Sequence, residues 1–469
     1  MARQKAEQVL EKRLPLTSNH QHAALPRLFI YGFKKTEEIM IKVYTHSLGC
    51  PKNMVDTENI LSGLKEHYFA VDRPFESDVV LINTCAFIRP AVEESLETIF
   101  SAAQDVKGLS QRPLLVVTGC LVSRYGTGLG REIPEADMFV PIARQAELPG
   151  KILYRLGRKV EAEAPGVRHG PFKSFAYVKI SEGCNNRCAF CTIPSIRGKL
   201  RSRPEHEVIQ EAGHLIDQGA GELVLVSQDS TAYGRDLGCR RGLSSLAEKL
   251  AGLEGLLRLR IMYLYPSGLN DGLLARLAEL GPPFVPYFDV PLQHANPELL
   301  KKMGRPFQQD PMEVIRRIRN YFPGAAIRTT LITGYPGEEE RHFRELLEFV
   351  RQARVQHLGV FPFYPEEGTR AAGFPGQIPD EVKNERQRLI MQEQKRVSRE
   401  YLKGFPGESL DILVDDPHPE WPGLYTGRAW FQAPEVDGLT YISGPGVGPG
   451  KMVRAEITAS HDYDLEALA

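Results

Sequence analysis

Apolar and polar positions alternate in blocks through residues 41–145. Short apolar runs of strand length are separated by stretches with helical spacing of apolar side chains, near 57–66 and 90–106. Strand and helix in alternation predict a parallel sheet covered by helices, an open α/β domain. The expected strands are 41–44, 79–83, 114–118 and 138–140.

A second alternating run follows, with helical patterns at 204–218, 243–253 and 341–353. Its strand–helix units predict a partial (β/α) barrel, a fold that places its chemistry at the C-terminal ends of the strands. Residues 380–403 have the pattern of a long polar helix. The expected strands are 175–180, 223–227, 259–264, 285–290, 327–332 and 357–361.

Residues 404–469 change pattern again. Short strands at 410–414, 423–429, 439–442 and 452–458 lie between Gly and Pro turns, which predicts a small antiparallel β-barrel. The chain thus divides into an N-terminal extension that we expect to be dispensable, an α/β domain, a linker, a (β/α) barrel with its following helix, and a β-barrel. The boundaries are 1–40, 41–145, 146–172, 173–403 and 404–469.

Charge and cysteine content narrow the function. The formal net charge of -1 excludes nucleic-acid binding through bulk charge and leaves a local basic patch as the alternative. We find no apolar run long enough to span a membrane and no secretory signal, so we expect a cytoplasmic protein with no membrane partner. Seven cysteines, an odd number, argue against a disulfide framework and leave metal binding, catalysis or burial.

Three of the cysteines form a Cys-x3-Cys-x2-Cys motif in the loop after strand 175–180. Cys184, Cys188 and Cys191 are suited to three corners of a 4Fe–4S cubane, which leaves the fourth iron open to a small molecule. A zinc site and unliganded thiols are the alternatives. Structural zinc needs four ligands, and the next histidine, His206, is far along the chain.

The stretch 182–194, Glu-Gly-Cys-Asn-Asn-Arg-Cys-Ala-Phe-Cys-Thr-Ile-Pro, resembles the cluster loop of radical S-adenosylmethionine enzymes. The following Arg197-Gly198 and Ser202-Arg203-Pro204 resemble the methylthiotransferase branch. The resemblance implies that S-adenosylmethionine chelates the open iron and is cleaved by one electron to a 5′-deoxyadenosyl radical. It also implies an electron donor of the flavodoxin or ferredoxin type.

Cys50, Cys85 and Cys120 each follow a predicted strand of the first domain. Open α/β sheets gather binding residues at these strand ends, so the pattern leaves open whether the three share a site or are core residues. The resemblance implies that they hold a second, auxiliary 4Fe–4S cluster with an open iron that carries the sulfur to be inserted, and hence a sulfur donor. Cys239 fits neither trio and is expected to be a free thiol.

Other stretches separate two branches of methylthiotransferases, one acting on adenosine in transfer RNA and the other on an aspartate of the twelfth small-subunit ribosomal protein. The present sequence resembles the second branch. That implies that one S-adenosylmethionine molecule methylates a sulfur. A second S-adenosylmethionine molecule supplies the radical that takes hydrogen from the aspartate β-carbon. The RNA-modifying relative and a non-enzymatic iron–sulfur carrier remain rivals. The matching stretches are 47–53 with Val55-Asp56, 228–237, 427–428 and 433–438.

The resemblance also implies that the C-terminal barrel is TRAM-like and recognises the substrate. Residues 404–469 contain three basic and eleven acidic residues, a net charge of -8. This balance is unsuited to phosphate backbones and suits a basic protein, although acidity for solubility is an alternative. We therefore expect no direct nucleic-acid target, and we expect Glu435 and Asp437 to lie on the acidic face.

Several further residues are candidates for substrate contacts, and we assign no side chain to catalysis. Glu222 and Gln228 are candidates to meet the methionine group of S-adenosylmethionine, and 333–338 to line its nucleoside side; a turn with a solvated acid is the alternative. Arg197, Arg201 and Arg203 would orient substrate or form a solvated basic loop. His294 is expected to have a hydrogen-bonded structural role.

Overall fold

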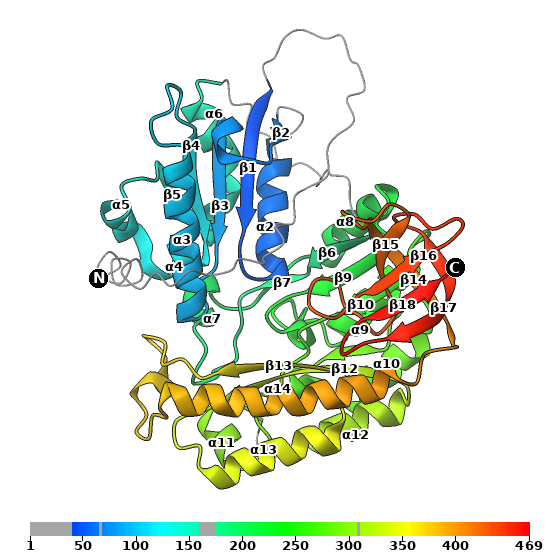
Figure 1. Cartoon of the computed structure of the whole chain (residues 1–469). Helices are drawn as coiled ribbons and strands as arrows, with labels where there is room; N and C mark the ends of the chain where they lie inside the picture. The colour runs from blue at the N-terminus through cyan, green and yellow to red at the C-terminus, as the bar shows by residue number, and fades with distance from the viewer. Residues whose placement is uncertain (1–39, 65–67, 159–167, 169–173, 307–309) are drawn as a thin grey trace. The chain divides into compact units, whose positions relative to one another are not determined.

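The computed structural model describes residues 40–64, 68–158, 168, 174–306 and 310–469. The described residues form two compact units (Figure 1). One holds residues up to 168 together with 192–198, and the other holds 174–191 and 199–469. The predicted extension 1–40 lies outside the described residues except for Met40. Among the described helices, none combines the length and the apolar character needed to cross a membrane.

The first unit is built on a five-stranded sheet in the order β2-β1-β3-β4-β5, with every neighbouring pair parallel. In this order the chain reverses direction across the sheet between β1 and β3, and such switch points are where open α/β sheets bind ligands. The strands are β1 (Ile41–Ser47), β2 (Tyr68–Ala70), β3 (Val79–Thr84), β4 (Leu114–Gly119) and β5 (Met138–Pro141).

Both faces of this sheet are buried because alternate strand residues pack in opposite directions. Val80 and Ile82 belong to the core under one set of helices, and Val79 and Leu81 belong to the core on the other side. The first set supplies core residues from α3 (Arg89–Asp105), α4 (Cys120–Tyr125), α5 (Leu129–Glu132) and α7 (Ile193–Arg197); the second from α2 (Pro51–Ser62) and α6 (Leu148–Arg155).

The second unit contains six parallel strands in two three-stranded sheets, ordered β10-β9-β6 and β11-β12-β13. A parallel bridge between Leu259 and Phe284 joins the two sheets into the partial barrel that the sequence predicts. The strands are β6 (Phe175–Lys179), β9 (Glu222–Val226), β10 (Arg258–Ile261), β11 (Tyr287–Asp289), β12 (Ala326–Thr333) and β13 (His357–Pro362).

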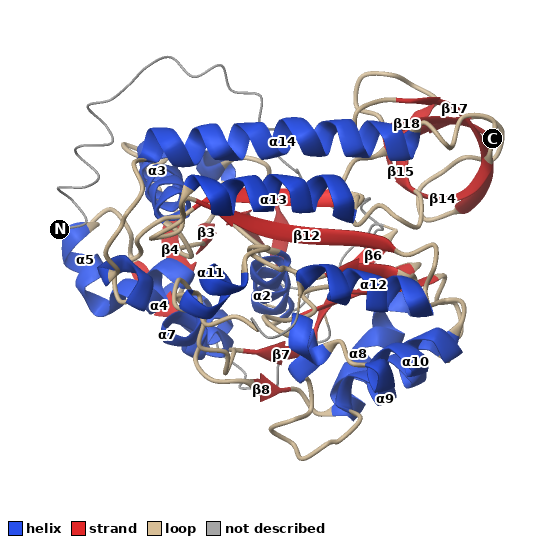
Figure 2. Cartoon of the chain, turned by 90° about the horizontal axis from the view of Figure 1, so that it is seen from below, coloured by secondary structure: helices blue, strands red, loops and turns tan. Residues whose placement is uncertain are grey.

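Helices cover the outside of this barrel, and α13 and α14 run side by side along it (Figure 2). Helix α13 buries one apolar stripe, including Phe343, Leu346 and Val350, in the barrel core. The helices are α8 (Glu205–Asp217), α9 (Gly242–Ala251), α10 (Asp271–Leu280), α11 (Pro297–Lys302), α12 (Pro311–Tyr321), α13 (Glu340–Ala353) and α14 (Asp380–Leu402); β7 (Ser181–Glu182) pairs with β8 (Arg201–Ser202).

The chain ends in a closed barrel in the order β14-β15-β16-β18-β17. All neighbouring pairs are antiparallel except β16 with β18, which is parallel, so the expected all-antiparallel barrel is corrected at that pair. The strands are β14 (Ser409–Pro417), β15 (Leu424–Arg428), β16 (Thr440–Ser443), β17 (Met452–Ser460) and β18 (Leu465–Leu468).

One predicted connector is partly helical. Helix α6 lies inside the range expected as a linker, 146–172, and its Leu148 and Ile152 are fully buried against the first sheet. Its Pro149 and Gly150 fall in the first turn, where a helix tolerates both residues. The turn-forming residues in this range predicted a loop. The structure has a helix there because it buries two apolar side chains.

Candidate active site

The Cys184–Cys191 loop leaves the end of β6 and carries its three thiols in partly buried positions. Polar side chains inside the loop hold its backbone in place. Asn186 donates to the carboxylate of Asp229 over 2.8 Å, and Asn185 accepts from the backbone N–H of Leu200 over 3.1 Å. The loop is therefore tied to the segment after β9, at the end of the barrel where such folds perform chemistry.

Backbone contacts clamp the loop from a second side. Ala189 donates to the carbonyl of Met303 over 2.8 Å, and its own carbonyl accepts from Ala371 over 2.9 Å. Gly304 is the point of closest approach, because a Cβ there would lie 2.8 Å from the Arg187 carbonyl oxygen. Its φ of +68° is also a conformation that favours glycine.

Arg305 places a positive charge beside the loop. Its Nη1 lies 3.7 Å from Cys188 Sγ, and its guanidinium lies 4.2 Å from the centre of the Tyr265 ring. Only 6% of Arg305 is exposed. Sequence reasoning did not select Arg305, because it is 114 residues beyond Cys191 and belongs to no motif.

Gln228 lies just after β9, near the same loop. Its side-chain amide donates to Glu182 Oε1 over 2.9 Å, and Glu182 also pairs with Lys179 over 2.9 Å. The other polar atom of the Gln228 side chain, Oε1, is buried without a hydrogen-bond partner among the described residues. The contact with S-adenosylmethionine expected for Gln228 stays a prediction.

The other three cysteines lie at the C-terminal edge of the first sheet. Cys50 follows β1 at the start of α2, Cys85 follows β3, and Cys120 begins α4 directly after β4. Cys50 and Cys85 therefore flank the topological switch point between β1 and β3. Gly49 permits their approach, because a Cβ there would lie 2.8 Å from Cys85 Sγ.

Asn53 connects the loops around this trio. Its amide donates to the carbonyls of Leu48 (2.7 Å) and Thr84 (3.1 Å), and its Oδ1 lies 4.0 Å from Cys120 Sγ. Asn53 is fully buried, so its hydrogen bonds are shielded from water. The sequence motif contains Asn53, but its spacing gives no sign of this bridging role.

Glu222 does not lie where it was expected. It is the first residue of β9, so Gln228 is beyond the opposite end of the same strand. Its carboxylate is completely buried and pairs with Arg260 over 2.6 Å and Arg428 over 2.5 Å. The prediction that Glu222 contacts S-adenosylmethionine is therefore wrong. Its carboxylate forms ion pairs with two guanidinium groups at the N-terminal end of the barrel.

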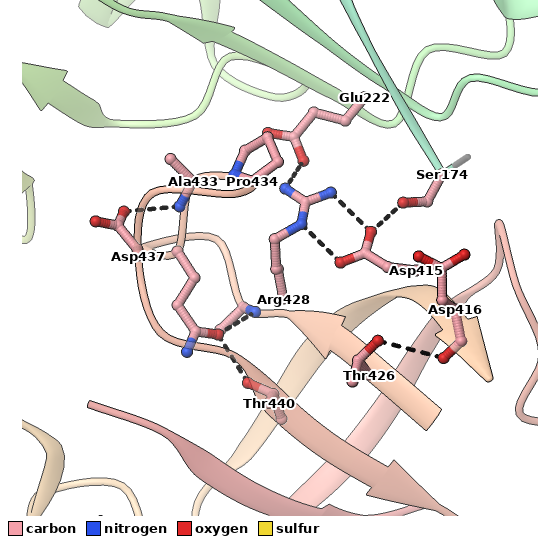
Figure 3. A network of polar contacts seen from close by, with 12 residues as sticks. Ser174, Glu222, Asp415, Asp416, Thr426, Arg428, Ala433, Pro434, Asp437 and Thr440 are labelled. Atoms are coloured by element: carbon pink, nitrogen blue, oxygen red, sulfur yellow. Dashed lines mark hydrogen bonds and ion pairs between the residues drawn. The ribbon is translucent and has the colours of Figure 1, made fainter. Parts of the chain in front are cut away.

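Arg428 connects the two barrels of the second unit (Figure 3). Its guanidinium binds Asp415 through both carboxylate oxygens, at 2.8 and 2.9 Å, as well as Glu222. Arg428 also contributes its carbonyl, which accepts from Arg258 over 2.8 Å. Within the signature Gly427-Arg428, Arg428 is therefore a docking contact.

Each of the six barrel strands sends at least one side chain to the segment 428–437, which we call the plug. The Asp437 carboxylate accepts hydrogen bonds from Arg328 over 2.5 Å and from the Tyr287 hydroxyl over 2.7 Å, and its side chain is only 1% exposed. The expectation that Asp437 lies on an acidic outer face is thus wrong. The contacting side chains are Tyr177, Glu222, Arg260, Tyr287, Arg328 and His357.

Family descriptions match three parts of the chain. The Radical SAM superfamily matches residues 178–350, the Uncharacterized protein family UPF0004 matches 42–141, and the TRAM domain matches 407–469. The proteins named Ribosomal protein uS12 methylthiotransferase RimO from Oleidesulfovibrio alaskensis and Nitratidesulfovibrio vulgaris are each 52% identical to the chain. Each alignment covers 92% of this chain and 100% of the relative. The chain belongs to the RimO family.

A solved structure supports the fold of this RimO-family chain. The radical S-adenosylmethionine methyltransferase TsrM from Kitasatospora setae, solved with cobalamin and a [4Fe-4S] cluster, is 16% identical with a TM-score of 0.51. The match covers 83% of this chain and 81% of that chain. The radical SAM assignment implies a 4Fe–4S cluster and S-adenosylmethionine.

Each cysteine trio offers three thiols, the kind of ligand that a 4Fe–4S cubane uses. In the part of the chain that the structure describes, no three His, Cys, Asp or Glu side chains lie at the spacing of a single-metal site. A cubane binds each thiolate to a different iron, so its ligands stand farther apart. Burial, together with the nearby Cys120 and Cys50, raises the pKa of Cys85 to about 12. Iron coordination would stabilise these thiolates.

The remaining candidates of this RimO-family chain fall in different surroundings. Arg201 is exposed, whereas Arg203 binds Glu211 and the Lys179 carbonyl, and Arg197 is buried in the first unit. A solvated basic loop therefore does not describe Arg197. Cys239 is exposed, as a free thiol would be.

Glu338, in the segment 333–338, is not a solvated acid. It is 2% exposed, binds Arg386 over 2.6 Å and accepts from the Gly334 N–H over 2.9 Å. Burial acts to raise the pKa of Glu338, but His294 and Arg386 hold it below its usual value. His294 is itself fully buried and accepts from the Asn296 N–H over 2.9 Å, an arrangement that fits a structural role.

Proposed function

We propose that the chain methylthiolates the β-carbon of an aspartate in ribosomal protein uS12 by radical S-adenosylmethionine chemistry. Two 4Fe–4S clusters take part, one on Cys184, Cys188 and Cys191 and an auxiliary one on the trio of the first unit. An electron donor and a sulfur donor complete the system. We place this reaction in the cytoplasm.

One observation carries the proposal: two separate cysteine trios, each at the C-terminal end of parallel strands, in a chain with the relatives described above. Three thiolates leave one iron of a cubane open. A carrier that only stores clusters has no need for such a vertex within a barrel. We also propose that the chain carries this function on three domains, at 41–145, 173–403 and 404–469.

The residues around Cys184, Cys188 and Cys191 would act by positioning the loop and its ligands. When bound, the clusters and S-adenosylmethionine supply the radical and the sulfur. The backbone clamp at Met303 and Ala371 fixes the loop, and Arg305 contributes positive charge next to Cys188. Gln228 offers a buried acceptor that is suited to an ammonium group such as that of methionine.

The test uses the purified chain, reconstituted anaerobically with iron and sulfide and supplied with uS12, S-adenosylmethionine and a reductant. We expect mass spectrometry to find a methylthio group on an aspartate of uS12, and chromatography to find 5′-deoxyadenosine. Cys188→Ala should abolish both products. Modification of transfer RNA instead of uS12 would favour the RNA-modifying rival, and a lack of 5′-deoxyadenosine would favour the iron–sulfur carrier.

A further inference from the structure

Helix α7 begins two residues after Cys191, yet it is part of the first unit. Ile196 belongs to the apolar core that also contains Ala86 and Leu121. Thr192 donates to the Phe87 carbonyl over 3.2 Å. These contacts anchor α7 within the first unit.

Arg197 is the last residue of α7, and its guanidinium lies near the auxiliary cysteines. It is 4% exposed, its Nη2 donates to Asn53 Oδ1 over 2.5 Å, and its Nη1 lies 3.3 Å from Asp56 Oδ2. The same Asn53 oxygen lies 4.0 Å from Cys120 Sγ. Arg197, Asn53 and Cys120 thus form one buried cluster that also includes Asp56.

The buried cluster places one cation and one anion next to the auxiliary cysteines. Arg197 donates to the same Asn53 oxygen that lies 4.0 Å from Cys120 Sγ, and Asp56 pairs with Arg197 on the same side. Charges at buried positions act strongly on their neighbours because little water screens them.

We propose that Arg197 is a positioning residue for the auxiliary cluster. It fixes the Asn53 amide beside Cys120 and offsets part of the negative charge of the thiolates, while Asp56 orients the guanidinium. This proposal rests on the auxiliary cluster of the proposed function. Net charge and hydrogen bonds to sulfur set the reduction potential of such clusters, so the arrangement predicts a measurable electronic effect.

The experiment is a redox titration followed by electron paramagnetic resonance. The parent protein carries Cys184→Ala, Cys188→Ala and Cys191→Ala, so that only the auxiliary cluster is present. Arg197→Gln should lower the midpoint potential, because a positive charge that favours the reduced cluster is lost. Asp56→Asn should raise it, because a negative charge is lost while Arg197 stays. Arg197→Lys, which keeps the charge, should lie closer to the parent than Arg197→Gln.

Arg89→Gln is the matched control, because Arg89 is a first-unit arginine four residues from Cys85 whose side chain is 63% exposed. Its midpoint should equal that of the parent. Shifts of Arg197→Gln and Asp56→Asn in the same direction, or no shift in either, would overturn the positioning role and leave a simple salt bridge. If Arg197→Gln does not fold, Asp56→Asn and Arg197→Lys decide the question. A folded parent that binds no iron would overturn the proposed function and, with it, this proposal.

Discussion

Arg428 is a buried cation that pairs with two buried carboxylates in the second unit. It is 1% exposed and lies between Glu222 and Asp415, which are also buried. Removing one partner of a buried ion pair costs more than the pair contributes, because the remaining charges stay desolvated. We expect Arg428→Met to lower the free energy of unfolding by about 3–5 kcal/mol, measured by urea denaturation.

Arg454→Met is the control for this change. Arg454 is in the same barrel and pairs with Asp411 over 3.3 Å, but both side chains are more than half exposed. Exposed pairs contribute about 0–1 kcal/mol, so the control should remain close to the wild type. Equal losses in the two variants would contradict the importance of the buried network.

Glu222 makes the network sensitive to acid. Burial alone would raise its pKa, but Arg260 and Arg428 lower it to about 2, from an ordinary value of 4.5. A carboxylate whose pKa is lower in the folded protein stabilises it above the unfolded pKa, and this contribution is lost as the pH falls from 4.5 to 2.

The prediction concerns the slope of stability against pH. Over that window Glu222→Gln should show a shallower fall in unfolding free energy, by up to about 1.4 kcal/mol per pH unit, because one group no longer takes up a proton on unfolding. Urea titrations at a series of pH values measure this slope. Parallel curves for wild type and variant would show that Glu222 does not titrate in this range.

The sequence could predict the six cluster cysteines as candidates but not the partners of the charged residues. Cys184, Cys188 and Cys191 lie close in sequence, so their spacing alone indicates shared chemistry. Glu222 and Arg428 are 206 residues apart and meet only when two barrels pack together. A carboxylate after a Gly-Ala-Gly turn therefore resembled a binding residue, although its role is to pair with arginines.

At the level of elements, the turn from β1 into α2 determines where Cys85 lies. Gly49 has a φ of +89°, and a Cβ would lie 2.7 Å from Cys85 Cβ. Gly49→Ala should displace Cys85 and reduce the iron held by the auxiliary trio. Gly108→Ala is the matched control: its φ is +82°, so it bears the same backbone strain, but nothing lies within 4 Å.

Iron analysis of both variants in the triple-alanine parent described above checks this prediction. Gly108→Ala should keep the iron content of the parent, with a stability loss of about 1–2 kcal/mol. If both variants lose iron equally, backbone strain rather than the position of Cys85 is responsible.

The two loops should also load independently, because each trio lies in its own unit. Replacing either trio with alanine should remove one of two clusters, and therefore about half of the iron. Iron and sulfide assays on the two triple variants measure this. A folded variant that loses all of its iron would contradict two separate sites.

Element boundaries were predictable where the apolar period was long. Strand β3 is a continuous buried run, and α13 has a complete apolar stripe, so their patterns are clear. The short strands β2 and β18 give too few residues for a period of two. Helix α7 has five residues, and only tertiary contacts assign it to the first unit.

At the scale of the second unit, the plug fixes the C-terminal barrel against the N-terminal ends of the (β/α) strands. Residues at that end of such barrels generally serve stability, whereas the opposite end carries the chemistry. The small barrel, with its acidic surface, is thus held by side chains from all six strands. Its exposed acids are Glu408, Asp411, Glu420, Glu435, Glu456 and Glu466.

This placement changes how the acidic face should be tested. Asp437 is part of the plug, so changing it would disturb docking as well as surface charge. Glu420 and Glu456 are exposed and outside that network. The double variant Glu248→Lys and Glu279→Lys is a matched control, since it makes the same change in charge at exposed sites on α9 and α10.

We expect Glu420→Lys with Glu456→Lys to slow methylthiolation of uS12 by about tenfold at low salt, because complementary charge mainly accelerates encounter. The difference should shrink as salt rises, since exposed charges are screened over about 8–10 Å. Formation of 5′-deoxyadenosine without uS12 should be unchanged. The Cys184–Cys191 loop lies at the C-terminal ends of the barrel strands, opposite the ends that contact the plug. Rates of both products, measured at two salt concentrations, decide the matter. If the control pair slows the reaction equally, overall charge is responsible, and the acidic face of the small barrel has no special part in recognition.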